Sequence, residues 1–259
     1  MPVTLIPFSD SPSCRGFTWI IDDIDELAKV VAHLLMGQYL HAEDLLAGKS
    51  FPQMTAAKAA YLTVLRELTQ PKDIAHRDGW LFQMISWTAA RLNEPSVLAR
   101  TPQPRPADKG FDGILVRQRP DGSALCVVVC EDKATKRPRK VIRDEVWPGI
   151  ETLETGARDH ELVSEVTTIL TAAMARHDAE EAVRRIVWRR AVRYRVSVTA
   201  DSTRANRARR KALFKGYPAV AQGNCVRRRG EMLILDDLRP WMAKFATRVA
   251  THLRKMKRV

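Results

Sequence analysis

Residues 109–133, KGFDGILVRQRPDGSALCVVVCEDK, contain the pattern that decides the fold. Two stretches rich in Val, Ile and Leu, residues 111–118 and 124–131, have the composition of β-strands. Between them lies Pro120-Asp121-Gly122-Ser123, whose central Asp-Gly pair is a strong signal for a tight hairpin turn. The stretch therefore predicts two antiparallel strands joined by a two-residue loop.

The predicted hairpin gathers polar groups at one end. With Asp121 and Gly122 as the loop, counting back along both strands places Asp112 opposite Glu131, on the same face of the sheet. Lys133 returns to that face two residues later. The sequence thus predicts a cluster of Asp112, Glu131 and Lys133 beyond an apolar face formed by Ile114, Val116, Val127 and Val129.

Two carboxylates this close disfavour each other's ionisation unless a cation lies between them. Mg²⁺ takes oxygen ligands, binds one or two carboxylates and keeps several waters, and it lowers the pKa of a bound water. We therefore expect Mg²⁺ (or Mn²⁺) on Asp112, Glu131 and the backbone carbonyl of Asp132, with Lys133 orienting water or offsetting charge on a phosphate. The alternative is a set of ordinary turn caps and surface ion pairs at strand ends.

The hairpin resembles the motif of the PD-(D/E)xK (restriction-endonuclease-like) nuclease superfamily. It has Asp112 beside one strand and Glu131-Asp132-Lys133 at the end of the next. The resemblance implies an α/β fold with an α-β-β-β-α-β core, a central mixed sheet flanked by helices, and metal-dependent hydrolysis of phosphodiester bonds. It also implies that Asp112 and Glu131 hold the metal and that Lys133 assists the water. Phe111 replaces the Pro that often precedes the Asp. In this superfamily a preceding helix often presents a Glu, or sometimes a Gln, to the site. Gln83 is the candidate here, and an ordinary Gln on the helix surface is the alternative.

The chain has a formal net charge of +13 that is unevenly distributed. Residues 181–259 hold 22 Lys and Arg against 5 Asp and Glu, whereas residues 1–180 are slightly acidic. A basic third of this kind is typical of nucleic-acid binding, although a solvated helix face, an acidic partner or an arginine-rich composition would also produce it. The candidate contacts follow the hairpin or lie near residue 207: Lys136, Arg137, Arg139, Lys140, Arg204, Arg207, Arg209, Arg210 and Lys211.

Periodicity predicts the remaining elements. We expect residues 1–70 to form an extension with strands at 3–8 and 16–20 and helices at about 24–37, 41–46 and 55–68, the last capped by Thr55. Residues 71–259 form the predicted core. It has a helix at about 72–92, a short strand at 96–100, a loop through Pro138, a helical region from about 146 to 175 broken near Gly156, and a helix capped by Asp178.

The last third is expected to supply two strands and two helices. Residues 191–201, AVRYRVSVTAD, alternate apolar with basic residues and predict a half-buried strand with a basic face. This strand is followed by an arginine-rich helix at about 204–214, a strand at 231–238 and an amphipathic helix at 238–256. The apolar stripe of that last helix is interpreted as core rather than as a membrane anchor.

The chain has no apolar run of about 20 residues and no basic start before its first apolar run, so we expect a cytoplasmic protein without a membrane span. The four cysteines show no CxxC spacing or disulfide framework, which fits a reducing compartment. The size, the absence of a recognisable sequence-reading domain and the basic C-terminal third are similar to nuclease subunits of bacterial anti-phage defence systems such as Hachiman. That similarity implies DNA as substrate and a controlling partner such as a helicase or another NTPase sensor. A non-catalytic nucleic-acid-binding subunit and a protein-interaction module remain the alternatives.

Overall fold

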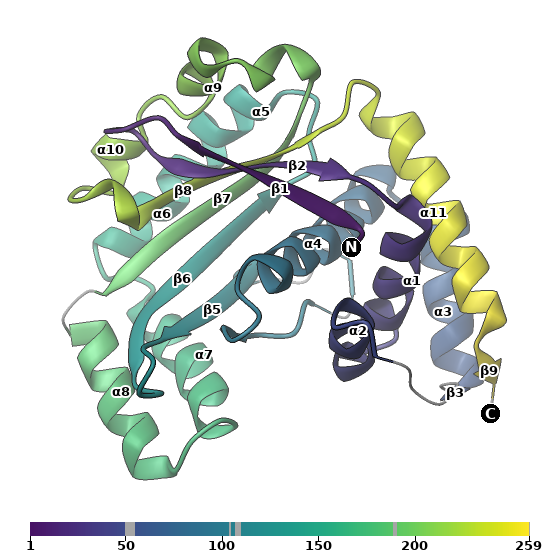
Figure 1. Ribbon diagram of the computed structural model, residues 1–259, viewed down its shortest axis with the longest axis horizontal. Helices are drawn as coiled ribbons and strands as arrows, with labels where there is room; N and C mark the ends of the chain where they lie inside the picture. Colours follow the sequence, from purple (N-terminus) through teal and green to yellow (C-terminus); the bar gives the residue numbers. More distant parts are fainter. Residues whose placement is uncertain (50–54, 104, 107–109, 189–190, 259) are drawn as a thin grey trace.

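The computed structural model describes residues 1–49, 55–103, 105–106, 110–188 and 191–258. Its centre is a seven-stranded sheet in the order β1-β2-β8-β7-β6-β5-β4, with helices on both faces (Figure 1). The pairs β2/β8, β8/β7 and β7/β6 are parallel, and the pairs β1/β2, β6/β5 and β5/β4 are antiparallel. The predicted mixed α/β class is confirmed. The strands are β1 (Val3–Ser9), β2 (Arg15–Ile21), β4 (Leu98–Ala99), β5 (Gly113–Gln118), β6 (Ala124–Lys133), β7 (Val192–Ala200) and β8 (Arg228–Ile234).

The predicted register of the central hairpin is confirmed, but its predicted loop is wrong. Gly113 pairs with Cys130 and Val116 with Val127, which is the register that places Asp112 beside Glu131. The loop nevertheless has three residues, because the Arg119 N–H donates to the Ser123 carbonyl and Gly122 adopts a left-handed φ of 79°. A β-bulge between Arg117 and Gln118 then restores the alignment of the two strands.

Strand β7 differs from the prediction because it lies in the middle of the sheet, between β6 and β8. Every residue from Tyr194 to Ala200 is buried. The expected basic face therefore does not exist, and Arg195 is 1% exposed. Alternation of apolar and charged residues predicted a solvated face, but a buried ion pair satisfies Arg195 instead.

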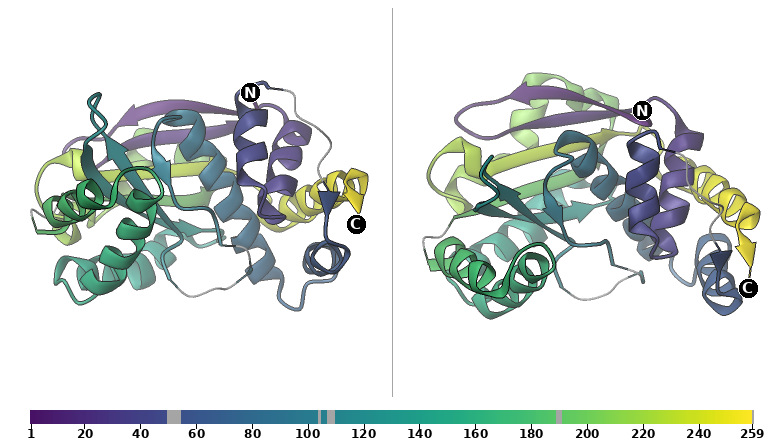
Figure 2. Two further views of the ribbon diagram at one scale, coloured as in Figure 1. Left: turned by 90° about the horizontal axis from the view of Figure 1, so that it is seen from below. Right: turned by 60° about the horizontal axis from the view of Figure 1, so that its bottom comes forward.

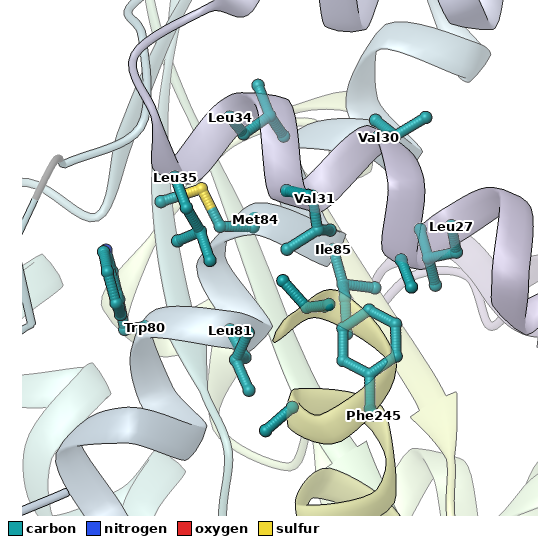
Figure 3. Packing of buried hydrophobic residues seen from close by; sticks show 14 of the residues in the cluster. Leu27, Val30, Val31, Leu34, Leu35, Trp80, Leu81, Met84, Ile85 and Phe245 are labelled. Carbon is teal, nitrogen blue, oxygen red and sulfur yellow. The ribbon is translucent and has the colours of Figure 1, made fainter. Parts of the chain in front are cut away.

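One face of the sheet is covered by helices from both ends of the chain. Residues 1–70, expected as an extension packed on the core, contribute β1 and β2 to the main sheet and three helices to this layer. Figure 3 shows α1 packing on α4 and α11 through Leu27, Val31, Leu81, Ile85 and Phe245. The helices are α1 (Ile24–Leu35), α2 (Tyr39–Leu46), α3 (Lys58–Thr69), α4 (Ile74–Asn93) and α11 (Leu238–Lys255). A two-stranded parallel pair, β3 (Thr55–Ala56) and β9 (Lys257–Arg258), lies beside α3 (Figure 1).

The opposite face is covered by the helices between β6 and β8 (Figure 2). A second hydrophobic cluster there contains the predicted apolar face of the hairpin, Ile114, Val116, Val127 and Val129, all buried. The helices are α5 (Pro138–Val141), a π-helical turn at Ile142–Val146, α6 (Trp147–Glu154), α7 (Asp159–Thr171), α8 (Arg176–Trp188), α9 (Arg207–Leu213) and α10 (Tyr217–Val220). Two 3₁₀ turns lie at Ser202–Ala205 and Cys225–Arg227.

Several predicted helix ends are shifted for local reasons. Pro138 is the first residue of α5 rather than part of a loop, since the first turn of a helix does not need its missing N–H. Thr55 lies in β3 and does not cap α3, and Asp178 lies inside the first turn of α8. The break near Gly156 is confirmed, with a left-handed φ of 81° between α6 and α7. Within the described ranges, no helix is long and apolar enough to cross a lipid bilayer.

Candidate functional site

The three predicted site residues meet at one end of the central hairpin. The Lys133 ammonium lies 3.1 Å from Asp112 Oδ2 and 3.1 Å from Glu131 Oε2. All three side chains are partly accessible, with exposed fractions of 15% for Asp112, 16% for Glu131 and 26% for Lys133. The predicted convergence of two carboxylates and an amine is therefore present in the structure.

Strand alternation explains this arrangement. Glu131 and Lys133 continue the row of Val127 and Val129 on one face of β6. Asp112 directly precedes β5 and extends the corresponding row of that strand. Because the two rows are opposed in the hairpin, the first polar positions after the apolar core meet at the same edge of the sheet.

Hydrogen bonds hold Asp112 from two further elements. The Asp132 backbone N–H donates to Asp112 Oδ2 at 2.8 Å, and Gln83 Nε2 donates to Asp112 Oδ1 at 2.6 Å. Gln83 lies on α4, so that helix contributes a donor to the site. The predicted supporting residue is thus in contact with the site through Asp112.

Charge coupling makes the three groups one electrostatic unit. Burial raises the pKa of Glu131, and the charge of Asp112 raises it further, against the lowering effect of Lys133 and Arg158. Burial alone would lower the pKa of Lys133, but the charges of Glu131 and Asp112 outweigh it and raise that pKa. Lys133 is therefore protonated in this structure, and its ammonium lies between the two carboxylates.

The Asp132 side chain belongs to the other face of β6. Its Oδ1 accepts a 2.6 Å hydrogen bond from Ser86 Oγ, and Arg195 Nη1 donates to the same hydroxyl at 2.8 Å. Arg195 also pairs with Glu231 through Nη2 and Oε2 at 2.8 Å, and Trp19 Nε1 donates to the same carboxylate oxygen. Burial raises the pKa of Asp132 to about 7. We call Asp132, Ser86, Arg195, Glu231 and Trp19 the buried network.

The donors at the hairpin end fit a hard divalent cation. No group of three or more Asp, Glu, His or Cys side chains lies close enough to form a metal site in the described ranges. Two carboxylates are nevertheless sufficient for Mg²⁺, which keeps several waters in its octahedron. Asp112 and Glu131 already converge on one cationic centre, the Lys133 ammonium. The backbone carbonyl of Asp132 as a further ligand stays a prediction.

The basic residues that follow β6 lie at the same edge of the sheet as the site. Lys136 and Arg137 are exposed directly after the strand. Lys140 is exposed and pairs with Asp144 at 2.9 Å. Arg139 has a structural partner, because its Nη1 donates to the Leu213 carbonyl at the end of α9.

The second basic segment follows the parallel strand β7 and therefore emerges at that edge too, with α9 beside α5 (Figure 1). Arg209 and Lys211 are exposed on α9. Arg210 is held by Asp10 at 2.7 Å and stacks on Phe8, while Arg207 lies 3.5 Å from the same Asp10. Arg204 pairs with Asp201 at 3.5 Å. The exposed members of this set are available to a ligand, whereas Arg139 and Arg210 have structural partners.

Two features of the site were not predicted. The buried network was missed because its members lie on α4, β2, β6, β7 and β8, and no local pattern connects them. Arg158, at the turn between α6 and α7, was missed because it lies far along the chain from the hairpin. The motif residues themselves carried the only sequence signal.

No protein-family model, curated protein or solved structure matches this chain. What the site does is therefore inferred from its own geometry and chemistry.

Proposed function

We propose that this protein is a metal-dependent nuclease of the PD-(D/E)xK type that hydrolyses phosphodiester bonds of DNA. The observation that supports the proposal most strongly is the convergence of Asp112 and Glu131 on Lys133 at the end of a central hairpin, each 3.1 Å from its ammonium. The order of elements from α4 through β4, β5, β6 and the following helices to β7 agrees with the α-β-β-β-α-β core that the resemblance implies.

Asp112, Glu131 and the carbonyl of Asp132 would hold Mg²⁺ or Mn²⁺. A divalent cation would supply Lewis-acid polarisation of the phosphate and a lower pKa for the attacking water. Gln83 and the Asp132 N–H fix the orientation of the Asp112 carboxylate, so this ligand is preorganised.

Lys133 supplies positive charge next to the reacting phosphate. As an ammonium it donates hydrogen bonds, as it does to Asp112 and Glu131 in this structure. Binding of a cation between the carboxylates would release the ammonium from one or both of its present ion pairs. The released group can then donate to a phosphate oxygen or to the attacking water.

Nucleic acid is the substrate class that fits the charge distribution. The exposed cations Lys136, Arg137, Arg209 and Lys211 lie on segments that leave the sheet at the same edge as the site. Cations of this kind bind phosphates and position the strand without reading its sequence. By similarity to defence nucleases, we further propose cytoplasmic action under the control of a helicase or another NTPase sensor.

A second candidate is a nucleic-acid-binding subunit that keeps this fold without cleaving. It is favoured by one observation, namely that the Lys133 ammonium pairs with both carboxylates at 3.1 Å. In that case Glu131→Gln would leave DNA binding unchanged, and no cleavage would occur with any divalent cation.

The test is incubation of the purified full chain with supercoiled plasmid in Mg²⁺, in Mn²⁺ and in chelator, alone and with the product of its neighbouring gene. We expect nicking or linearisation that requires the cation and is lost in Glu131→Gln and Lys133→Ala. Glu180→Gln, which removes an exposed carboxylate from α8, is the matched control and should cleave normally. Cleavage that persists in Glu131→Gln would refute the assignment of the site.

A further inference from the structure

Arg158 occupies the turn between α6 and α7, next to the start of the hairpin. Its guanidinium carbon lies 4.3 Å from the centre of the Phe111 ring. Phe111 is buried and directly precedes Asp112, so its ring fixes the guanidinium beside the candidate site. Stacking of this kind on an aromatic face is favourable for Arg and restricts its side chain.

The side chain is held from one side only. Nε donates to Glu161 Oε1 at 3.0 Å and Nη2 donates to Glu161 Oε2 at 2.7 Å, which is a two-pronged pair. Nη1 donates no hydrogen bond to the described part of the chain. The side chain is 25% exposed, so the unused donors remain accessible to a ligand.

The charge of Arg158 acts on the site itself. Burial raises the pKa of Glu131, and the charge of Arg158 acts against this increase. The hydrogen bond with Glu161 raises the pKa of Arg158, and the charge of Glu131 adds to it. Arg158 and Glu131 form no ion pair within 4.0 Å in the described structure, so this carboxylate does not hold the guanidinium.

We propose that Arg158 binds a non-bridging oxygen of the substrate phosphate through Nη1. This inference rests on the proposed nuclease function and names the group of the substrate that the residue recognises. Arg donors that are already oriented by a carboxylate and an aromatic ring bind phosphate with little loss of side-chain entropy.

The charge balance gives a reason for such a residue. Asp112, Glu131 and Glu161 are three acids, and Lys133 and Arg158 are two cations. A divalent cation would leave this group with one net positive charge, which attracts a phosphodiester anion. Without Arg158 the group would be neutral, and the attraction would be lost.

Two small phosphate compounds test the inference, because they are too small to contact the basic segments after β6 and β7. The first is bis(p-nitrophenyl) phosphate, a phosphodiester too small to reach α9, whose hydrolysis is followed with the full chain in Mn²⁺. We expect Arg158→Ala to lower kcat/KM by about 10-fold or more, as for a lost hydrogen bond to a charged group. Arg176→Ala is the matched control, because it removes an exposed Arg that pairs with a Glu on α8, outside the site. It should stay within about 3-fold of wild type, since the donors of Arg158 remain in place.

The second probe is inorganic phosphate, whose binding to wild type, Arg158→Ala and Arg176→Ala is measured in Mg²⁺ by ³¹P NMR line broadening. Binding that is lost only in Arg158→Ala supports the inference even if no phosphodiester is cleaved, so the two proposals can fail separately. Equal phosphate binding by wild type and Arg158→Ala, absence of binding in wild type, or an equal loss in Arg176→Ala would overturn it. Circular dichroism melts of the three proteins confirm that each is folded.

Discussion

The two faces of strand β6 carry charged groups in opposite situations. On the α4 side, Asp132 belongs to the buried network, in which Arg195 and Glu231 are 1% and 2% exposed. On the other side, Glu131 and Lys133 are ion-paired but partly open to solvent. Adjacent residues of one strand therefore have different roles. The closed face fixes α4 against the sheet, and the open face keeps charges that can exchange partners.

The open face depends on the closed one. Ser86, which donates to Asp132, lies one turn after Gln83 on α4, and Gln83 donates to Asp112. The buried network thus sets the position of α4 from which Gln83 reaches the site. Substitutions on the two faces should therefore have different effects, with the largest change in stability expected on the closed face.

Arg195→Met should be the most destabilising change. It removes the cation that lies 2.8 Å from Glu231 and leaves only Arg229, at 3.6 Å, beside that buried carboxylate. Breaking a buried ion pair in this way costs about 3–5 kcal/mol. Urea unfolding at pH 7 measures the loss. Arg176→Met, which removes an exposed pair with Glu180, should leave the urea midpoint close to that of wild type. Similar losses in the two variants would mean that the closed face is not a stabilising unit.

Charge reversal on α9 should weaken DNA binding by about 10-fold or more at low salt. Arg209→Glu with Lys211→Glu removes two exposed cations, and each lost phosphate contact reduces the slope of affinity against salt by about one. Fluorescence anisotropy with a labelled duplex measures both quantities. Arg176→Glu with Arg184→Glu makes the same change of net charge on α8. If this control weakens binding equally, only net charge matters and α9 is not the contact surface.

Asp132→Asn should change how stability depends on pH. The folded pKa of Asp132, about 7, lies above its ordinary value of 3.8, so between these values the folded state binds more protons than the unfolded state. This carboxyl therefore makes wild type less stable as pH rises from about 4 to about 7, and its effect levels off above that. Asn cannot titrate, so unfolding measured at pH 5 and pH 7.5 should show a smaller decrease for the variant. An equal decrease in both proteins would place the titration elsewhere.

Gln83→Ala should have the smallest effect. It removes one hydrogen bond to a carboxylate that keeps two other donors, the Asp132 N–H and Lys133 Nζ. We expect plasmid cleavage to fall by several-fold while melting changes little. Gln83→Glu is the informative companion, because it supplies a carboxylate in place of the donor. Unchanged cleavage in Gln83→Ala would show that the Asp132 N–H alone orients Asp112.

The site was predictable because it is local. Asp112, Glu131 and Lys133 lie on one hairpin, and the period of two along a strand carries the register from the turn to the strand ends. The register survived an error in the loop, since the extra residue at the turn is compensated by the bulge at Arg117 and Gln118.

The buried network and the position of Arg158 were not predictable, because they depend on residues far apart in the sequence. Arg195 has the spacing of a solvated residue, and only the position of β7 between two parallel strands, together with Glu231 from β8, makes it buried. Arg158 reaches the site through the packing of α7 against β5, which no sequence period encodes. Long-range pairing of charges is therefore the part of this fold that needs the three-dimensional structure.

Binding of Mn²⁺ to the full chain, measured by calorimetry for wild type, Glu131→Gln and Glu180→Gln, tests the central claim most directly. If Asp112 and Glu131 hold a divalent cation, wild type and Glu180→Gln bind a single Mn²⁺ with equal affinity, and Glu131→Gln loses it. Equal binding by wild type and Glu131→Gln, or no binding by wild type, would show that the open face of β6 holds only the ion pairs of Lys133.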